Sequence, residues 1–251
     1  MGKEWITGRN PVYETLIARK RHFFELRLSQ GVEVKGHLQE IVSTVQTFKL
    51  PVRRVPRQQL DQIGSNHQGV ALQASAYPYS DLTDVLNFTE SSGEPGFYLL
   101  LDTLQDPQNL GTLLRTAEAV GIHGVFIPAH RAAGVTPAVV NASSGASEHL
   151  RIVQGNLAQF IQVLKEKNVW IMGLEDSPEA QPIETVNLDG GLGLVVGSEG
   201  SGLRDLVRKS CDLLIRLLMR GKIESLNASV AGSIALYQAF QVRQRSQHAP
   251  K

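Results

Sequence analysis

The chain of 251 residues contains a single cysteine, Cys211, so no disulfide can form within it. We expect Cys211 to be a small core residue and not a catalytic thiol. No apolar run approaches the roughly 18 residues that a membrane span requires, and the first residues form no apolar signal region. We therefore expect a soluble, cytoplasmic protein without a membrane segment.

Several signatures of cofactor and metal binding are also missing. The chain has no G-x-G-x-x-G fingerprint, no Walker A sequence and no G-x-S-x-G elbow. A nucleotide-dependent oxidoreductase is therefore disfavoured. Histidines stand singly, without the spacing of metal ligands, so we expect no metal site.

The formal net charge of +1 hides an uneven distribution. Residues 1–80 contain 11 Lys/Arg and 6 Asp/Glu, whereas residues 81–251 contain 14 and 18. A basic N-terminal part followed by an acidic part is typical of a chain whose N-terminal domain binds a polyanion. Small domains can also carry a few excess charges of one sign without any such function.

The hydrophobic pattern divides the chain into three parts. Residues 1–76 read as a small αβ domain, residues 77–95 as a linker that contains Pro78, and residues 96–251 as an α/β domain. We expect strands at 97–101, 124–128, 169–174, 193–197 and 213–218, and helices at 109–120, 156–167, 202–209 and 225–243. This alternation predicts a parallel sheet with helices on both faces and ligands at the carboxyl ends of the strands.

Three polar segments follow these strands. The first is Asp106-Pro107-Gln108-Asn109-Leu110-Gly111, with Arg115 one turn later. The second runs from the strand 194–196 into Gly197-Ser198-Glu199-Gly200, where glycines let backbone amides approach a ligand. The third, Glu224-Ser225-Leu226-Asn227-Ala228-Ser229, opens the last helix.

Each polar residue also has a purely structural interpretation. Asn109 and Ser225 are typical helix caps, Arg115 fits a solvated helix face, and Glu199 fits a helix N-terminal charge. The last helix carries a stripe of small residues, which suits close packing within the chain and a symmetric dimer equally well. That stripe consists of Ala228, Ala231, Gly232, Ala235 and Ala239.

In order and spacing, the three segments resemble the motifs of the TrmH/SpoU branch of the SPOUT superfamily over residues 97–243. The segment Gly8-Arg9-Asn10-Pro11-Val12-Tyr13-Glu14 is similar to the opening of the RNA-binding domain found in bacterial 23S rRNA guanosine 2′-O-methyltransferases. The resemblance implies an L30e-like first domain, a SPOUT-type parallel sheet with a C-terminal trefoil knot, and a homodimer.

The resemblance also implies the residues of the site. The catalytic set is Asn109, Arg115, Glu199, Ser225 and Asn227. S-adenosylmethionine is expected against Gly197, Leu217, Met219, Ser225 and Leu226, and Leu218 stands where the family usually has proline. Because arginine stays protonated at neutral pH, we expect Arg115 to position the 2′-hydroxyl and stabilise its developing charge.

The implied substrate is 23S rRNA, free or in a ribosomal precursor. Basic residues of the first domain are expected to contact the phosphates; they are Arg9, Arg19, Lys20, Arg21, Arg53 and Arg54. The expected reaction is S-adenosylmethionine-dependent ribose 2′-O-methylation, at a guanosine. The alternatives are a tRNA ribose methyltransferase and a non-catalytic RNA-binding protein on the same scaffold.

Overall fold

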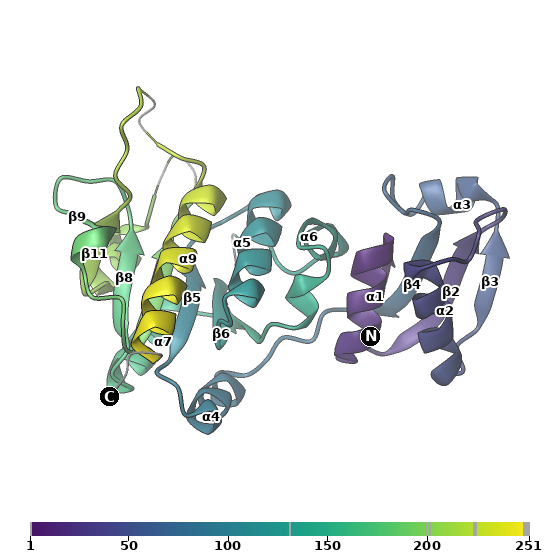
Figure 1. The fold of residues 1–251 in the computed structure, drawn as a ribbon, viewed down its shortest axis with the longest axis horizontal. Coiled ribbons are helices and arrows are strands. Elements are labelled where there is room, and N and C mark those ends of the chain that lie inside the picture. The colour runs from purple at the N-terminus through teal and green to yellow at the C-terminus, as the bar shows by residue number, and fades with distance from the viewer. Residues whose placement is uncertain (1, 131, 199, 201, 223–224, 248–251) are drawn as a thin grey trace. The chain divides into compact units, whose positions relative to one another are not determined.

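The computed structural model describes residues 2–130, 132–198, 200, 202–222 and 225–247 (Figure 1). The chain forms two compact units. The first combines Met1–Pro78 with Val135–His149, and the second combines Tyr79–Gly134 with Leu150–Lys251.

The first unit is built on a four-stranded mixed sheet. Its strands are β1 (Lys3–Thr7), β4 (Val70–Ser75), β2 (Phe23–Ser29) and β3 (Val52–Val55), in the order β1-β4-β2-β3. Strand β4 is antiparallel to both β1 and β2, and β3 runs parallel to β2 as an edge strand. The helices are α1 (Arg9–Ala18), α2 (His37–Thr47) and α3 (Arg57–Asp61).

An excursion of the chain between β6 and β7 completes this unit. It contains α6 (Pro137–Ala142) and a 3-10 turn, Ala146–Glu148. The Asn141 side-chain amide donates to the Thr7 hydroxyl at 3.1 Å, and the Tyr77 hydroxyl donates to the Ser147 carbonyl at 3.0 Å. Division by sequence pattern assigned residues 135–149 to the second domain, because the anchoring contacts join residues far apart in the chain.

The second unit contains a seven-stranded sheet in which every neighbouring pair is parallel. Its order is β7-β6-β5-β10-β8-β11-β9. The strands are β5 (Phe97–Leu101), β6 (Gly124–Pro128), β7 (Ile152–Gly155), β8 (Trp170–Leu174), β9 (Gln181–Pro182), β10 (Leu192–Val196) and β11 (Leu213–Arg216). The helices are α4 (Leu82–Ser92), α5 (Pro107–Ala119), α7 (Leu157–Glu166), α8 (Asp205–Ser210) and α9 (Ala228–Gln247), with a short 3-10 turn at Ile183–Thr185.

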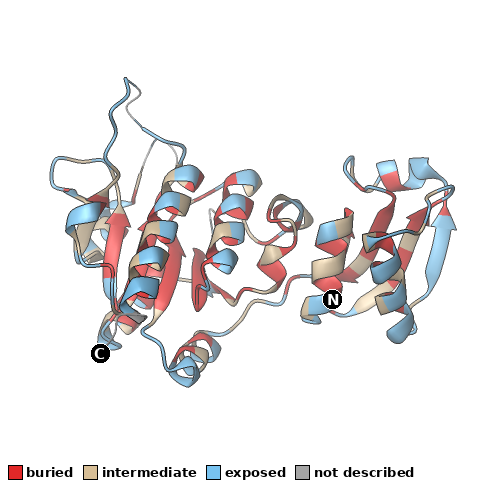
Figure 2. Ribbon diagram, in the orientation of Figure 1, coloured by how far each residue is buried: buried red, intermediate tan, exposed pale blue. Residues whose placement is uncertain are grey.

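Helices cover both faces of this sheet, as the alternating sequence pattern predicts. Leu100 and its register partner Val195 face a core that also takes Val85 of α4, Ile161 of α7 and Val207 of α8. On the opposite face α5 and α9 lie side by side (Figure 1). The sheet is therefore apolar on both faces, and strands β5, β6 and β10 are buried along their whole length (Figure 2).

The small residues of α9 are used inside the chain. A Cβ at Gly232 would lie 2.7 Å from a Leu113 methyl and 3.0 Å from a Val196 methyl, and Ala235 and Ala239 are buried. The stripe thus lets α9 pack closely on α5 and β10.

Helix α4 lies within residues 77–95, which the sequence pattern predicts as a linker, but it belongs to the second unit, where Val85 is part of the core. The trefoil knot stays a prediction. Among the described residues, no helix has the length and apolar character needed to cross a membrane.

Candidate functional site

A cavity of about 610 Å³ opens at the carboxyl edge of the large sheet. It lies where β8, β10 and β11 end and α9 begins. The lining residues are Leu174, Glu175, Asp176, Val196, Gly197, Ser198, Gly200, Gly202, Arg216, Leu217, Met219, Ser225, Leu226, Asn227, Ala228 and Ala231. The cavity therefore collects the second and third polar segments, which are separated in sequence by α8 and β11.

The turn after β10 folds back tightly on itself. Ser198 and Gly202 exchange two backbone hydrogen bonds, each 3.1 Å long. A Cβ at Gly197 would lie only 2.4 Å from the Gly202 carbonyl carbon, so only glycine permits this approach. Gly197, Ser198, Gly200 and Gly202 of this turn line the cavity. Glu199, expected to be catalytic, lies outside the described residues.

A buried carboxylate holds the far end of this turn. Asp102, at the end of β5, has no exposed surface. It accepts a hydrogen bond from the Arg204 backbone N–H at 2.8 Å and another from Arg204 Nε at 2.6 Å. Because a charge-assisted pair of this kind fixes both distance and direction, Asp102 sets where the turn ends and α8 begins.

The start of α9 is joined to the start of α5. Asn227 caps α9, because its Oδ1 accepts from the backbone N–H groups of Ser229 and Val230 at 2.9 and 3.2 Å. Its Nδ2 donates to Asn109 Oδ1 at 3.1 Å. The Ser229 hydroxyl lies 3.0 Å from Asn109 Oδ1 and 2.6 Å from Asn227 Oδ1, and its single proton serves one of them at a time.

The structure separates Asn109 from Arg115. Asp106 is the cap of α5, accepting from the Gln108 N–H at 3.0 Å, so Asn109 is not a cap but a buried residue of the first turn. Arg115 is exposed, about 9 Å further along the helix axis from the rise per residue, and does not line the cavity.

Charged side chains occupy one wall of the cavity. Arg208 Nε donates a hydrogen bond to Glu175 Oε1 at 2.9 Å. Arg208 Nη2 also donates to Glu179 Oε2 at 2.7 Å, and this hydrogen bond holds the pKa of Glu179 below its usual value. Asp176 and Arg216 face one another more loosely, with Arg216 Nη1 and Asp176 Oδ1 4.0 Å apart. Arg216 Nε is buried and has no hydrogen-bond partner among the described residues.

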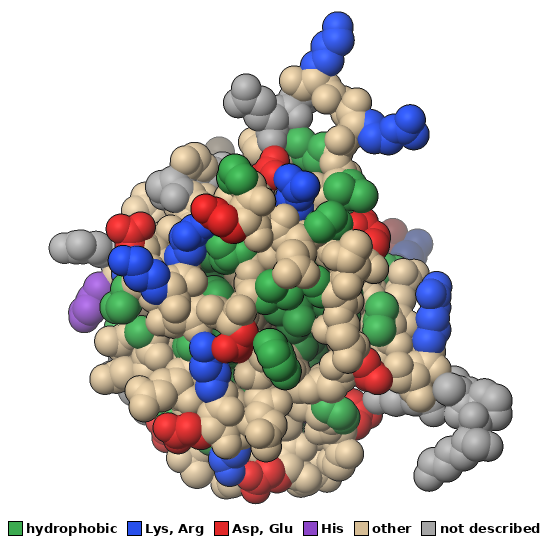
Figure 3. All heavy atoms as spheres, turned by 90° about the vertical axis from the view of Figure 1, so that its left-hand side faces the viewer, with side chains coloured by type: hydrophobic (Ala, Val, Ile, Leu, Met, Phe, Trp, Pro, Cys, Tyr) green, Lys and Arg blue, Asp and Glu red, His purple; other side chains and the backbone are tan. Residues whose placement is uncertain are grey.

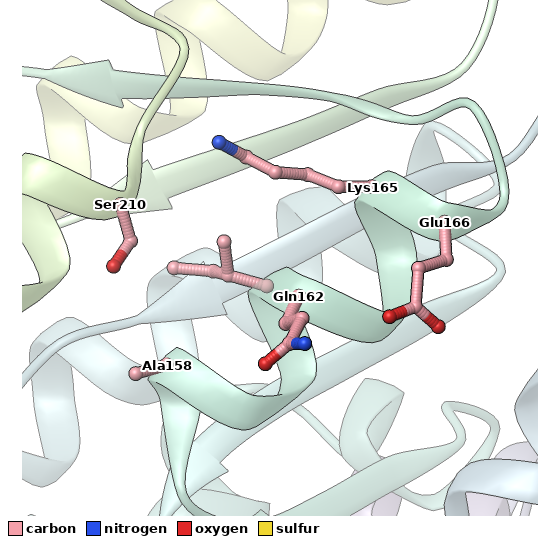
Figure 4. A pocket seen from close by; sticks show the side chains of 6 residues that line it. Ala158, Gln162, Lys165, Glu166 and Ser210 are labelled. Atoms are coloured by element: carbon pink, nitrogen blue, oxygen red, sulfur yellow. The ribbon is translucent and has the colours of Figure 1, made fainter.

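A second hollow lies away from the motif residues. Figure 4 shows Ala158, Gln162 and Lys165 of α7 on one side and Ser210, at the end of α8, on the other. Lys165 is already paired with Asp212 at 2.7 Å. This hollow contains none of the residues of the three polar segments, so the candidate site is the cavity at the sheet edge.

Two other kinds of site are absent from the part of the chain that the structure describes. No three His, Cys, Asp or Glu side chains come together as a metal site. Burial raises the pKa of the Cys211 thiol to about 12, so the sulfur is protonated at neutral pH.

The basic residues of the first unit divide into exposed and buried groups. Arg19, Lys20, Arg53 and Arg54 are exposed, and Arg9 is half-buried beside Gln68. Arg21 corrects the sequence analysis. Its side chain is fully buried and bound to Glu148 and Glu4, so it is not offered to RNA.

Sequence reasoning thus placed Gly197, Leu217, Met219, Ser225 and Leu226 together, and the structure lines one cavity with all five. It missed Ser229, which lies within the third segment, and it missed Asp176 and Arg216. Asp176 follows β8 and Arg216 ends β11, neither within a motif, so only their shared position at the sheet edge identifies them.

Comparisons with known proteins agree with this geometry. A family model described as "SpoU rRNA Methylase family" matches residues 96–237, and one described as "RNA 2′-O ribose methyltransferase substrate binding" matches residues 5–80. A Bacillus subtilis protein named as a TrmH family tRNA/rRNA methyltransferase, YacO, is 41% identical over 244 residues, covering 96% of each chain. A Staphylococcus saprophyticus protein of the same family name is 38% identical, covering 95% of each.

Solved structures show the same fold. The SpoU methyltransferase AviRb from Streptomyces viridochromogenes, in complex with AdoMet, superposes with a TM-score of 0.80 at 21% identity, covering 98% of this chain and 92% of that one. An AdoMet-bound rRNA methyltransferase from Sinorhizobium meliloti gives 0.78 at 22% identity, covering 99% and 88%.

Proposed function

The chain belongs to the SpoU rRNA methylase family and is an RNA methyltransferase, and on this premise we propose that it methylates a ribose 2′-hydroxyl of 23S rRNA, at a guanosine, using S-adenosylmethionine. One observation carries the proposal. The second and third polar segments, distant in sequence, line a single cavity, and Asn227 of the third segment joins the first segment to them through its hydrogen bond to Asn109.

The cavity suits S-adenosylmethionine. Its volume falls in the ~300–1,000 Å³ range of small-molecule sites, and its lining combines backbone, apolar and charged groups. Among the described residues Arg216 Nε has no hydrogen-bond acceptor, so the protein alone does not satisfy this guanidinium. When bound, S-adenosylmethionine supplies a sulfonium-activated methyl group.

The protein's part in the reaction is to hold the ribose hydroxyl. Methyl transfer joins the methyl carbon to the 2′-oxygen and releases S-adenosylhomocysteine and the hydroxyl proton. We assign Arg115 to the hydroxyl and its neighbouring phosphate, where a guanidinium stabilises developing negative charge without accepting the proton. Asn109, Asn227 and Ser229 hold the start of α9 on that of α5 and so position Ser225 beside the cavity.

RNA is assigned to the exposed basic residues of the first unit. Arg53 and Arg54 lie on the edge strand β3, and Arg19 and Lys20 follow α1. Phosphate contacts of this kind give affinity, and sequence is read from unpaired bases. A 23S rRNA substrate, free or in a ribosomal precursor, implies work in the cytoplasm.

A homodimer formed through α9 is part of the proposal. Val230, Ile234 and Tyr237 are 44%, 38% and 52% exposed at helical spacing, although the opposite face of α9 is buried on α5 and β10. Figure 3 shows the left-hand side of the view in Figure 1, where hydrophobic side chains gather near the centre with charged side chains around them, whereas the exposed residues of α9 are identified by their burial values. Light scattering of wild-type protein and Tyr237→Glu tests this, since we expect a dimer and a monomer respectively.

The test is transfer of labelled methyl from S-adenosylmethionine to unmodified 23S rRNA and to 50S precursor particles, with bulk tRNA in parallel. We expect label on a ribose of 23S rRNA, at least 100-fold less with Arg115→Ala, and full transfer with the control Arg245→Ala at the far end of α9. Label on tRNA alone would overturn the rRNA target, and label on neither RNA would overturn the reaction.

A further inference from the structure

Arg216 has the features of a ligand-binding residue that no sequence motif identifies. It lines the cavity at the end of β11, and its side chain is 38% exposed. Of its donors, Nε is buried without an acceptor among the described residues. A buried donor of a charged group that lacks an acceptor costs stability unless something completes it.

The nearest carboxylate does not complete it. Asp176 Oδ1 is 4.0 Å from Nη1, beyond hydrogen-bond range, and Asp176 is 58% exposed. A pair at this distance near solvent contributes little to stability. Glu175, on the same wall, is engaged by Arg208 at 2.9 Å. No hydrogen bond joins the Nη groups of Arg216 to a described residue, and the side chain is partly exposed, so these donors are available to a group inside the cavity.

The charges of the cavity wall match one end of the proposed methyl donor. Among the described lining residues, Arg216 is the only cation. S-adenosylmethionine has one anionic group, the carboxylate of its amino-acid end, with an ammonium on the adjacent carbon. A guanidinium binds carboxylate through two parallel hydrogen bonds, and a carboxylate 4.0 Å from that guanidinium is placed to face the ammonium.

We propose that Arg216 binds the carboxylate of the amino-acid end of S-adenosylmethionine, with Asp176 facing the ammonium. This inference rests on the proposed function, since it needs that molecule in this cavity. It assigns the adenosine end to the remainder of the described lining, where glycine backbone and apolar side chains stand beside Ser198, Ser225 and Asn227. Arg216 thereby selects ligands that carry the amino-acid group over nucleosides that lack it.

The test compares three ligands by calorimetry, with no turnover involved. S-adenosylhomocysteine carries both charged groups, its decarboxylated analogue keeps only the ammonium, and 5′-methylthioadenosine has neither. With Arg216→Met we expect affinity for S-adenosylhomocysteine to fall roughly 10- to 100-fold. Affinities for the other two should stay within about twofold of wild type, which also shows that the variant is folded.

A matched control removes a neighbouring positive charge. Arg220, in the same loop after β11, is exposed and does not line the cavity, so Arg220→Met should leave all three affinities unchanged. Asp176→Asn should weaken binding of the two ammonium-bearing ligands alone. Equal losses for all three ligands with Arg216→Met, or no loss, would overturn the assignment. Failure of the wild-type protein to bind S-adenosylhomocysteine would instead overturn the proposed function.

Discussion

Two arginines, one in each unit, differ in how far the protein satisfies the hydrogen-bond donors of their guanidinium groups. Arg21 has no exposed side-chain surface, and each of its nitrogen atoms donates to an acceptor. Glu148 takes two of these hydrogen bonds, at 3.0 and 2.7 Å, while Glu4 and the Ser75 carbonyl share the third nitrogen. Arg216 is partly exposed, and its Nε has no acceptor among the described residues.

We interpret Arg21 as a residue that stabilises the fold and Arg216 as a residue that binds a ligand. A buried charge is tolerated when its partners are fixed and complete, and losing one partner is then costly. A charge at a cavity wall with an unused donor adds little to folding and is suited to recognition. The sequence analysis named Arg21 as one of six residues expected to contact RNA and did not identify Arg216.

The largest loss of stability is expected from removing an acceptor of the buried Arg21 guanidinium. Glu148→Ala removes both oxygens that Arg21 Nε and Nη2 use and leaves a guanidinium inside the first unit. We expect the free energy of unfolding of that unit to fall by about 3 kcal/mol. Urea unfolding checks this in a Trp170→Phe background, where Trp5 of β1 is the remaining tryptophan.

The double variant Arg21→Met, Glu148→Leu separates charge from packing. Apolar residues of similar size in place of a buried ion pair are often nearly neutral, so most of the lost stability should return. A double variant as unstable as Glu148→Ala would show that shape, and not an unpaired charge, explains the loss.

Most of the large sheet could be predicted because its signals are local. Strands such as 97–101 are continuous apolar runs, and helices such as 157–166 have an apolar stripe, so periodicity alone locates them. Since polar segments follow the carboxyl ends of strands, the general position of the site followed as well. Strand β9, with two residues, is too short to leave such a signal.

The remainder depends on contacts between distant parts of the chain. Arg21 and Glu148 are 127 residues apart, and nothing near either residue shows that residues 135–149 complete the first unit. Arg216 and Asp176 are brought together by the pairing of β11 with β8, and no spacing rule anticipates it. Asn109 and Asn227 were identified by motif, but their hydrogen bond appears only in the folded chain.

A smaller loss of stability is expected from breaking the Arg204–Asp102 ion pair of the second unit. Arg204 is half exposed, while its partner Asp102 is fully buried at the end of β5. Arg204→Ala leaves Asp102 with the backbone N–H of residue 204 alone, and we expect a loss of about 2 kcal/mol. Because the same pair anchors the turn 197–204, affinity for S-adenosylhomocysteine should fall too. Stability lost with no change in affinity would show that the turn keeps its shape without this anchor.

The smallest effect is expected in the pH dependence of stability, and it comes from His123, a buried side chain whose hydrogen bond requires the neutral imidazole. His123 Nδ1 accepts a hydrogen bond from the Phe97 backbone N–H at 3.0 Å, which requires that nitrogen to be unprotonated. Burial, with help from the charge of Arg243, lowers the pKa of His123 below its usual value. An unfolded histidine titrates near pH ~6.5, so between the two pKa values the unfolded chain binds more protons. Stability should therefore fall as the pH drops below about 6.5, by no more than about 1.4 kcal/mol per pH unit for this single proton.

Thermal unfolding of wild type and His123→Gln between pH 8 and 5 isolates this contribution. The variant should be less stable at pH 8, where it lacks the imidazole, and should lose less stability than wild type on acidification. His130→Gln provides the matched control, because it removes an exposed histidine from the same unit. Parallel curves for wild type and His123→Gln would mean that other groups set the acid sensitivity of the second unit.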